Sequence, residues 1–103
     1  MKDIEIIELI CNYFHIKYED LIEIRSYEHQ LIKRFCIYFL KLNGSKISNI
    51  NRLLGIDNYN WTKTMYNRIE QFFKSDTNMF TNHLIIILSL ISYESKLRSE
   101  RNN

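Results

Sequence analysis

The sequence predicts an all-α fold, a compact bundle of about six helices, on three observations. Proline is absent from the 103 residues and the only glycines are Gly44 and Gly55, so few residues interrupt a helix. Apolar residues recur at three- and four-residue spacing, the period of an amphipathic helix. Hydrophobic residues make up 46% and charged residues 25% of the chain, a globular balance. We therefore expect one helical domain over residues 1–92 and a polar C-terminal extension or tail over residues 93–103.

The N-terminal segment has the pattern of two helices. Apolar residues at helical spacing predict an amphipathic helix over residues 3–15. A tight corner at residues 16–17 then leads to a short second helix over residues 18–22, and a loop covers about residues 23–27. We expect this corner of the domain to be compact.

The strongest apolar stripe predicts a long third helix from about Tyr27 to Leu42. Asn43 and Gly44 follow it and supply a left-handed stop, the usual end of such a helix. Ser45 is then the expected N-cap of a fourth helix, since serine side chains accept hydrogen bonds from free N–H groups at helix starts.

Residues 45–73 have the pattern of a helix-turn-helix, with a fourth helix that ends at Gly55 and a fifth from about Tyr59 to Phe73. The glycine permits a sharp turn, and apolar side chains on both helices would hold the second helix where it can enter a DNA major groove. These side chains are Ile47, Ile50, Leu53, Leu54 and Ile56, followed by Thr62, Met65, Tyr66 and Ile69.

A break at residues 75–77 precedes a predicted sixth helix, whose longest apolar run covers residues 84–91. This run is too short to span a bilayer, which needs about 20 residues, so we expect a core helix and no membrane partner. Cys11 and Cys36 lie in apolar stripes, outside any metal-binding spacing, and are expected to be buried free thiols. The thiols, and an N-terminus unlike a secretory signal, favour a cytoplasmic location.

Charge is divided unequally along the chain, although the net charge is only +2. Residues 1–24 hold two lysines against six carboxylates, residues 25–74 hold nine basic against three acidic residues, and residues 75–103 are balanced. An electropositive binding face would produce this distribution, and so would a solvated surface. The histidines are far apart and no acid–base or metal-ligand constellation is present, so we expect no enzyme, no metal and no cofactor.

The outer face of the predicted fifth helix carries hydrogen-bonding side chains three to four residues apart, whereas Trp61 is expected at the core edge. Asn suits the adenine edge, Lys suits guanine or phosphate, and Thr can hydrogen-bond or pack on thymine. The alternative is a solvated face rich in Asn because the coding DNA is A·T-rich. The predicted base-reading residues are Asn58, Tyr59, Asn60, Lys63, Thr64 and Asn67. The predicted phosphate contacts are Arg25, Lys33, Arg34, Lys46 and Arg52.

Two segments resemble the C-terminal DNA-binding domain of the bacterial replication initiator DnaA. Residues 11–22 look like that family's opening, in which an aromatic pair precedes a short helix marked by Asp20 and Leu21. Residues 34–40 are similar to the long helix after the family's basic loop. The resemblance covers about residues 4–91 and implies a helix-turn-helix fold that binds double-stranded DNA.

In that family the signature Gly-Arg-Asp-His-Thr-Thr-Val opens the recognition helix and supplies its base contacts. The corresponding residues from Arg to Val differ at every position and are here Asp57, Asn58, Tyr59, Asn60, Trp61 and Thr62. We therefore expect a freestanding relative with its own DNA specificity, in the replication or regulation of a mobile element. The alternative is a protein-interaction module that has lost DNA binding and forms a homodimer through its C-terminal helix.

Overall fold

The computed structural model describes residues 2–75, together with Ser89, Lys96 and Leu97. Apart from those last three, the predicted sixth helix, the homodimer surface on it and the polar tail lie outside the described residues. Residues 2–75 form helices without strands, which confirms the all-α prediction there. The five helices are α1 (Asp3–Tyr13), α2 (Tyr18–Glu23), α3 (Tyr27–Leu42), α4 (Ile47–Leu54) and α5 (Tyr59–Ser75).

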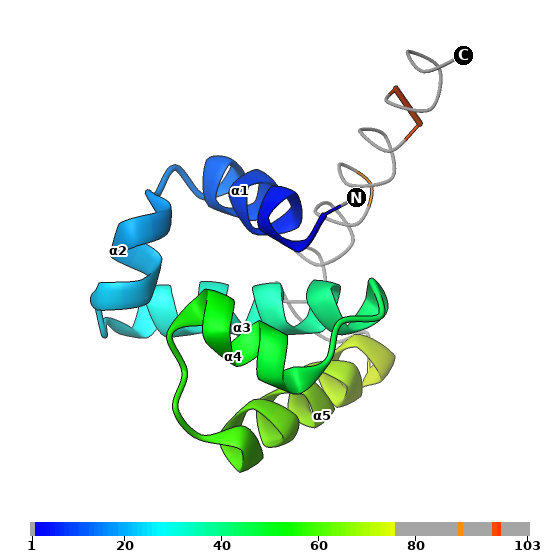
Figure 1. Ribbon diagram of the computed structural model, residues 1–103. Coiled ribbons are helices and arrows are strands. Elements are labelled where there is room, and N and C mark those ends of the chain that lie inside the picture. Colours follow the sequence, from blue (N-terminus) through cyan, green and yellow to red (C-terminus); the bar gives the residue numbers. More distant parts are fainter. Residues whose placement is uncertain (1, 76–88, 90–95, 98–103) are drawn as a thin grey trace.

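The third helix, α3, is the centre of the fold, and each of the other four helices packs against it (Figure 1). Every side chain from Phe35 to Leu40 is buried, which a helix covered on one side alone could not achieve. The surrounding helices complete one apolar core around this segment. Their fully buried contributions include Ile7 and Ile10 from α1, Leu21 from α2, Ile50 and Leu54 from α4, and Ile69 from α5.

Three helices end in the same hydrogen-bonded motif, with one residue in the left-handed conformation. That residue is Gly44 after α3, at φ +87°, as predicted, His15 after α1, at φ +58°, and Gly55 after α4, at φ +65°. In each, the N–H of the next residue donates to the carbonyl five positions earlier, at 2.9 to 3.0 Å. The motif at His15 ends α1 at Tyr13, two residues before the predicted end.

The predicted role of Ser45 as a helix cap is wrong. Lys46 occupies the N-cap position of α4, while the Ser45 hydroxyl donates to a carboxylate oxygen of Asp3 at 2.5 Å. Asp3 also accepts hydrogen bonds from the side-chain amides of Asn43 at 2.9 Å and Asn49 at 2.7 Å. This Asp3 clasp joins the start of α1 to the α3–α4 turn and to α4.

The electrostatics of the Asp3 clasp favour the ionised carboxylate. Burial alone would raise the pKa of Asp3, but the hydrogen bonds from Ser45, Asn43 and Asn49 outweigh it and hold the pKa below 3.8. The clasp is thus strongest at a pH above the pKa of Asp3, at which the carboxylate is charged.

Candidate functional site

The fifth helix, α5, has one face in the core and one face outside the bundle. Thr62, Met65 and Ile69 are buried against α3 and α4, and Trp61 lies half-buried at the core edge, as predicted. Figure 1 shows α5 at the opposite side of the bundle from α1, with α3 and α4 between them. The outer face of α5 is therefore not covered by any other described helix.

A tight turn over residues 55–58 joins α4 to α5. Gly55 has φ +65°, a conformation that strains any residue with a Cβ. A Cβ added at Gly55 would also lie 2.8 Å from Cγ2 of Ile22, because α2 packs directly against the turn. The Tyr18 hydroxyl, also on α2, donates to the Leu53 carbonyl at the end of α4. The turn is thus held from the α2 side.

Buried polar contacts fix α5 relative to α4. The hydroxyl of Thr62, a fully buried residue, donates to the side-chain oxygen of Asn51 on α4.

Asn58 caps α5, because its side-chain oxygen accepts from the Trp61 N–H at 3.1 Å. Sequence reasoning missed this cap. This hydrogen bond uses the side-chain oxygen of Asn58. Only the side-chain amino group of this predicted base-reading residue is then left to contact a base.

The other predicted base-reading residues lie together on the outer face of α5, and all are exposed. Tyr59 is the most apolar of them and is 56% exposed. Within the part of the chain that the structure describes, their side chains form no hydrogen bond or ion pair. These residues are Tyr59, Asn60, Lys63, Thr64 and Asn67.

One basic residue on this face was missed by the sequence prediction. Arg68 is exposed, one helical turn after Thr64 and next to Asn67. Its signal was the four-residue spacing from Thr64, which places both on the same side of a helix.

The predicted phosphate contacts divide into an exposed group and a group with buried atoms. The exposed group consists of Arg25, Lys46 and Arg52. Lys46 lies at the start of α4. Arg52 lies near its end, where a guanidinium nitrogen donates to the side-chain oxygen of Asn49 at 2.6 Å. Since the Asn49 amino group donates to Asp3, the Asp3 clasp extends to Arg52 and restricts its side chain.

The prediction for Lys33 is wrong, because this side chain is only 6% exposed. Its Nζ donates to the Ile22 carbonyl near the end of α2, at 3.4 Å. Burial lowers the pKa of Lys33, and neighbouring Arg25 lowers that pKa further. Arg34 is half-buried, and its Nε is buried without a partner among the described residues. The central position of α3 explains both outcomes.

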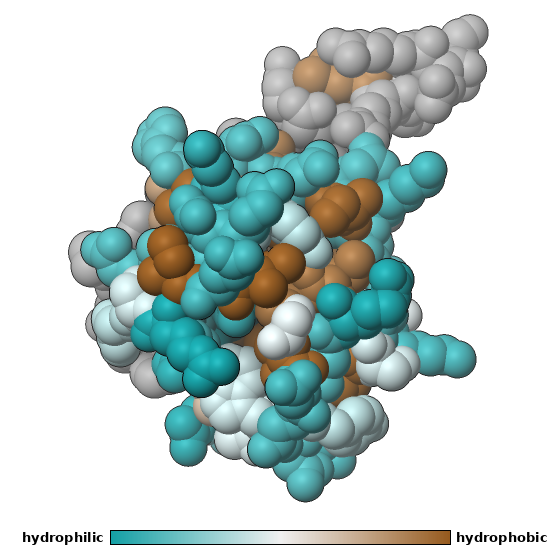
Figure 2. Space-filling model, turned by 60° about the vertical axis from the view of Figure 1, so that its left-hand side comes forward, coloured by the Kyte–Doolittle hydropathy of each residue, from teal (hydrophilic) through white to brown (hydrophobic). Residues whose placement is uncertain are grey.

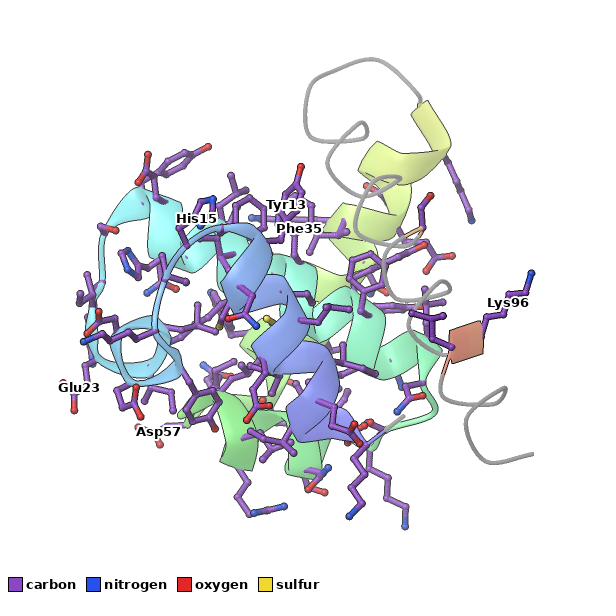
Figure 3. The ribbon with its side chains drawn as sticks, turned by 90° about the horizontal axis from the view of Figure 1, so that it is seen from above. Tyr13, His15, Glu23, Phe35, Asp57 and Lys96 are labelled. Atoms are coloured by element: carbon purple, nitrogen blue, oxygen red, sulfur yellow. The ribbon has the colours of Figure 1, made fainter. Side chains whose placement is uncertain are left out.

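Charge is distributed differently over the two sides of the bundle. Residues 44–69 contain four basic side chains and one carboxylate, Asp57, whereas Glu8, Glu19 and Glu23 are exposed on α1 and α2. Figure 3 shows Asp57 and Glu23 at the same edge of the bundle. On the face that Figure 2 shows, most of the surface is hydrophilic and apolar residues emerge at several places between the hydrophilic ones. The outer face of α5 carries no carboxylate from Tyr59 to Ile69, and the carboxylate of the next residue, Glu70, is paired with Lys74 at 3.2 Å.

Reactive groups do not gather at this site. Burial raises the pKa of Cys11 to about 11 and the pKa of Cys36 well above its ordinary value, so both predicted free thiols stay protonated at neutral pH. In residues 2–75, 89, 96 and 97, no three His, Cys, Asp or Glu side chains are grouped so as to hold a metal ion. Among the same residues, no helix is both long enough and apolar enough to cross a membrane.

No protein-family model matches the chain, and no curated protein has a matching sequence. The candidate site is thus defined by the chain's own residues.

Proposed function

We propose that this chain is a sequence-selective module for double-stranded DNA, in which α4 and α5 form a helix-turn-helix and α5 lies in the major groove. The observation that carries the proposal is the outer face of α5, where exposed hydrogen-bonding side chains have no partner in the described part of the chain. A major groove about 12 Å wide admits one α-helix and presents donors and acceptors to such side chains.

The junction of α4 and α5 supports the helix-turn-helix. The two helices are separated only by residues 55–58, and the left-handed Gly55 turns the chain sharply between them. The Thr62–Asn51 hydrogen bond and the packing of α5 on α4 hold the second helix rigidly. A rigid recognition helix can hold several side chains in register with base edges.

Exposed basic residues around α5 supply the phosphate contacts in this proposal. Lys46 is the N-cap residue of α4 and Arg52 lies on α4, the first helix of the pair, and in this class of domain that helix crosses the DNA backbone. Arg25 and the additional residue Arg68 extend the set, and Lys33 is removed from it because it is buried. Phosphate contacts supply affinity and orientation, whereas the uncharged hydrogen-bonding side chains of α5 supply sequence selectivity.

The resemblance to the DnaA C-terminal domain agrees with this arrangement. Thr62 occupies the position of the last residue of that family's signature, a valine, and is fully buried. Tyr59 and Asn60, at two of the positions before it, are exposed with different side chains. On this basis we propose that the chain is a cytoplasmic relative of that domain that acts in the replication or regulation of a mobile element, with double-stranded DNA as partner.

A salt titration of DNA binding tests the proposed function. The full chain is mixed with a fluorescent 30-base-pair duplex of mixed sequence, and anisotropy is followed from low to physiological salt. We expect binding at low salt that weakens steeply, because each phosphate contact contributes about −0.9 to the slope of log K against log salt. Lys63→Ala should weaken binding, and Lys17→Ala, at an exposed position before α2, should not. Failure to bind any duplex at low salt would exclude the function.

A further inference from the structure

The asparagines of the described chain divide into those that stabilise the fold and those that do not. Asn12 on α1, and Asn60 and Asn67 on α5, are exposed and have no side-chain partner among the described residues. The amides of the other four are all hydrogen-bonded within the fold. They are Asn43 and Asn49 in the Asp3 clasp, Asn51 on Thr62, and Asn58 at the start of α5.

The two free amides of α5 lie on one line along its outer face. Asn60 and Asn67 are seven residues apart, so they are two turns and about 10 Å apart along the helix. Thr64 lies between them on the same face, and Gln71, also exposed, continues the line by one further turn. Basic residues lie beside this line, with Lys63 on one flank and Arg68 on the other.

A free primary amide matches one base better than the others in the major groove. Adenine presents the N7 acceptor beside the N6 donor, and an amide can bond both at once. Guanine presents two acceptors there, so the amide oxygen would face another oxygen without a hydrogen between them. The methyl group of Thr64 adds a surface for the methyl group of thymine.

From this geometry we propose that the outer face of α5 selects A·T-rich duplex DNA, with Asn60 and Asn67 each pairing with one adenine. The proposal rests on the proposed function and names the class of DNA that this site takes. Asn60 and Asn67 are then the residues that determine specificity, and Lys63 and Arg68 contribute mainly to affinity.

Selection from a random duplex library tests the proposal, with the wild-type chain, Asn60→Ala, Asn67→Ala and Asn12→Ala in parallel. Wild type and Asn12→Ala should enrich the same A·T-rich motif. Asn60→Ala and Asn67→Ala should each lose an adenine preference, at a different position of the motif. Affinity for the wild-type motif should fall about tenfold in either α5 variant. Alanine is a better helix former than asparagine, so the exposed substitutions should not unfold α5.

Two results would overturn the inference in different ways. A G·C-rich motif, or an unchanged motif in both α5 variants, would reject adenine reading by these residues while leaving DNA binding intact. Absence of any enrichment, together with no retention of duplex at low salt, would reject the proposed function and the inference with it.

Discussion

The polar side chains of α4 and α5 differ in what they contact. On α4, Asn49 is bonded to Asp3 and Arg52, and Asn51 accepts from the buried Thr62. On the outer face of α5, Asn60 and Asn67 contact no other side chain of the described chain through hydrogen bonds. Similar residue types thus stabilise the fold in one helix and remain available to a partner in the next. Substitutions of these α4 side chains should therefore lower stability, whereas substitutions on the outer face of α5 should weaken DNA binding.

The largest effect on stability is expected at the turn between these helices. Gly55→Ala should lower the free energy of unfolding by about 2 to 4 kcal/mol, because it adds left-handed strain and a clash with Ile22. Urea unfolding followed by circular dichroism measures the change. Gly44→Ala is the matched control, since Gly44 is also left-handed but a Cβ there meets nothing within 4 Å. Gly44→Ala should cost about 1 kcal/mol from left-handed strain alone, and equal losses in both variants would contradict the tight packing of α2.

A smaller loss is expected when the buried link between α4 and α5 is removed. Thr62→Val keeps the shape but deletes the hydroxyl that Asn51 accepts from, and should cost about 1 to 2 kcal/mol in urea unfolding. Thr64→Val, on the outer face of the same helix, should change stability by less than about 0.5 kcal/mol. A Thr64→Val loss as large as that of Thr62→Val would show that the outer face also stabilises the fold.

The Asp3 clasp should make part of the stability depend on acid. Asp3→Asn removes the negative charge and one of the two accepting oxygens, so the three donors Asn43, Ser45 and Asn49 cannot all be kept, and it should cost about 1 kcal/mol at pH 7. The pKa of Asp3 is lower in the folded state than its ordinary value of 3.8. The extra stability of wild type over Asp3→Asn is therefore complete above pH 3.8 and is lost as the pH falls through the folded-state pKa. Unfolding of both proteins from pH 7 to pH 2.5 measures the difference. A constant gap over that range would exclude a charge-dependent clasp.

The smallest expected effect separates an exposed cation from a buried one. Arg52→Ala should reduce the magnitude of the salt slope of DNA binding by about one, as expected for the loss of one phosphate contact. Lys33→Met should leave the slope unchanged, because the Lys33 ammonium group is buried against the Ile22 carbonyl. Anisotropy titrations of the two variants at several salt concentrations give both slopes. A reduced slope in Lys33→Met would restore the original prediction for that residue.

The helices were predictable from the sequence because apolar spacing and local stops determine them. The bounds of α3 agree at both ends, and Gly44 provides its left-handed stop. The prediction of about six helices stays untested beyond α5, which ends at Ser75.

The errors at Ser45 and Lys33 have a common cause, since each depends on a tertiary contact that the local sequence pattern does not report. Ser45 bonds Asp3, which is 42 residues away, and so does not cap α4. Lys33 follows the charge pattern of a surface residue, but α3 is covered on several sides. The cap formed by Asn58 is a local contact, to the N–H three residues later, and the sequence prediction missed it. The exposed α5 residues were predicted correctly as one face, because helical period alone places them.

The most direct test of the account is an NMR titration of the labelled chain with duplex DNA, followed through its side-chain amide resonances. We predict that the amide groups of Asn60 and Asn67 shift together with the backbone of α5, while the exposed amide of Asn12 on α1 keeps its position. Shifts confined to α1 and α2, or no shift on α5 at low salt, would contradict DNA binding through the outer face of α5.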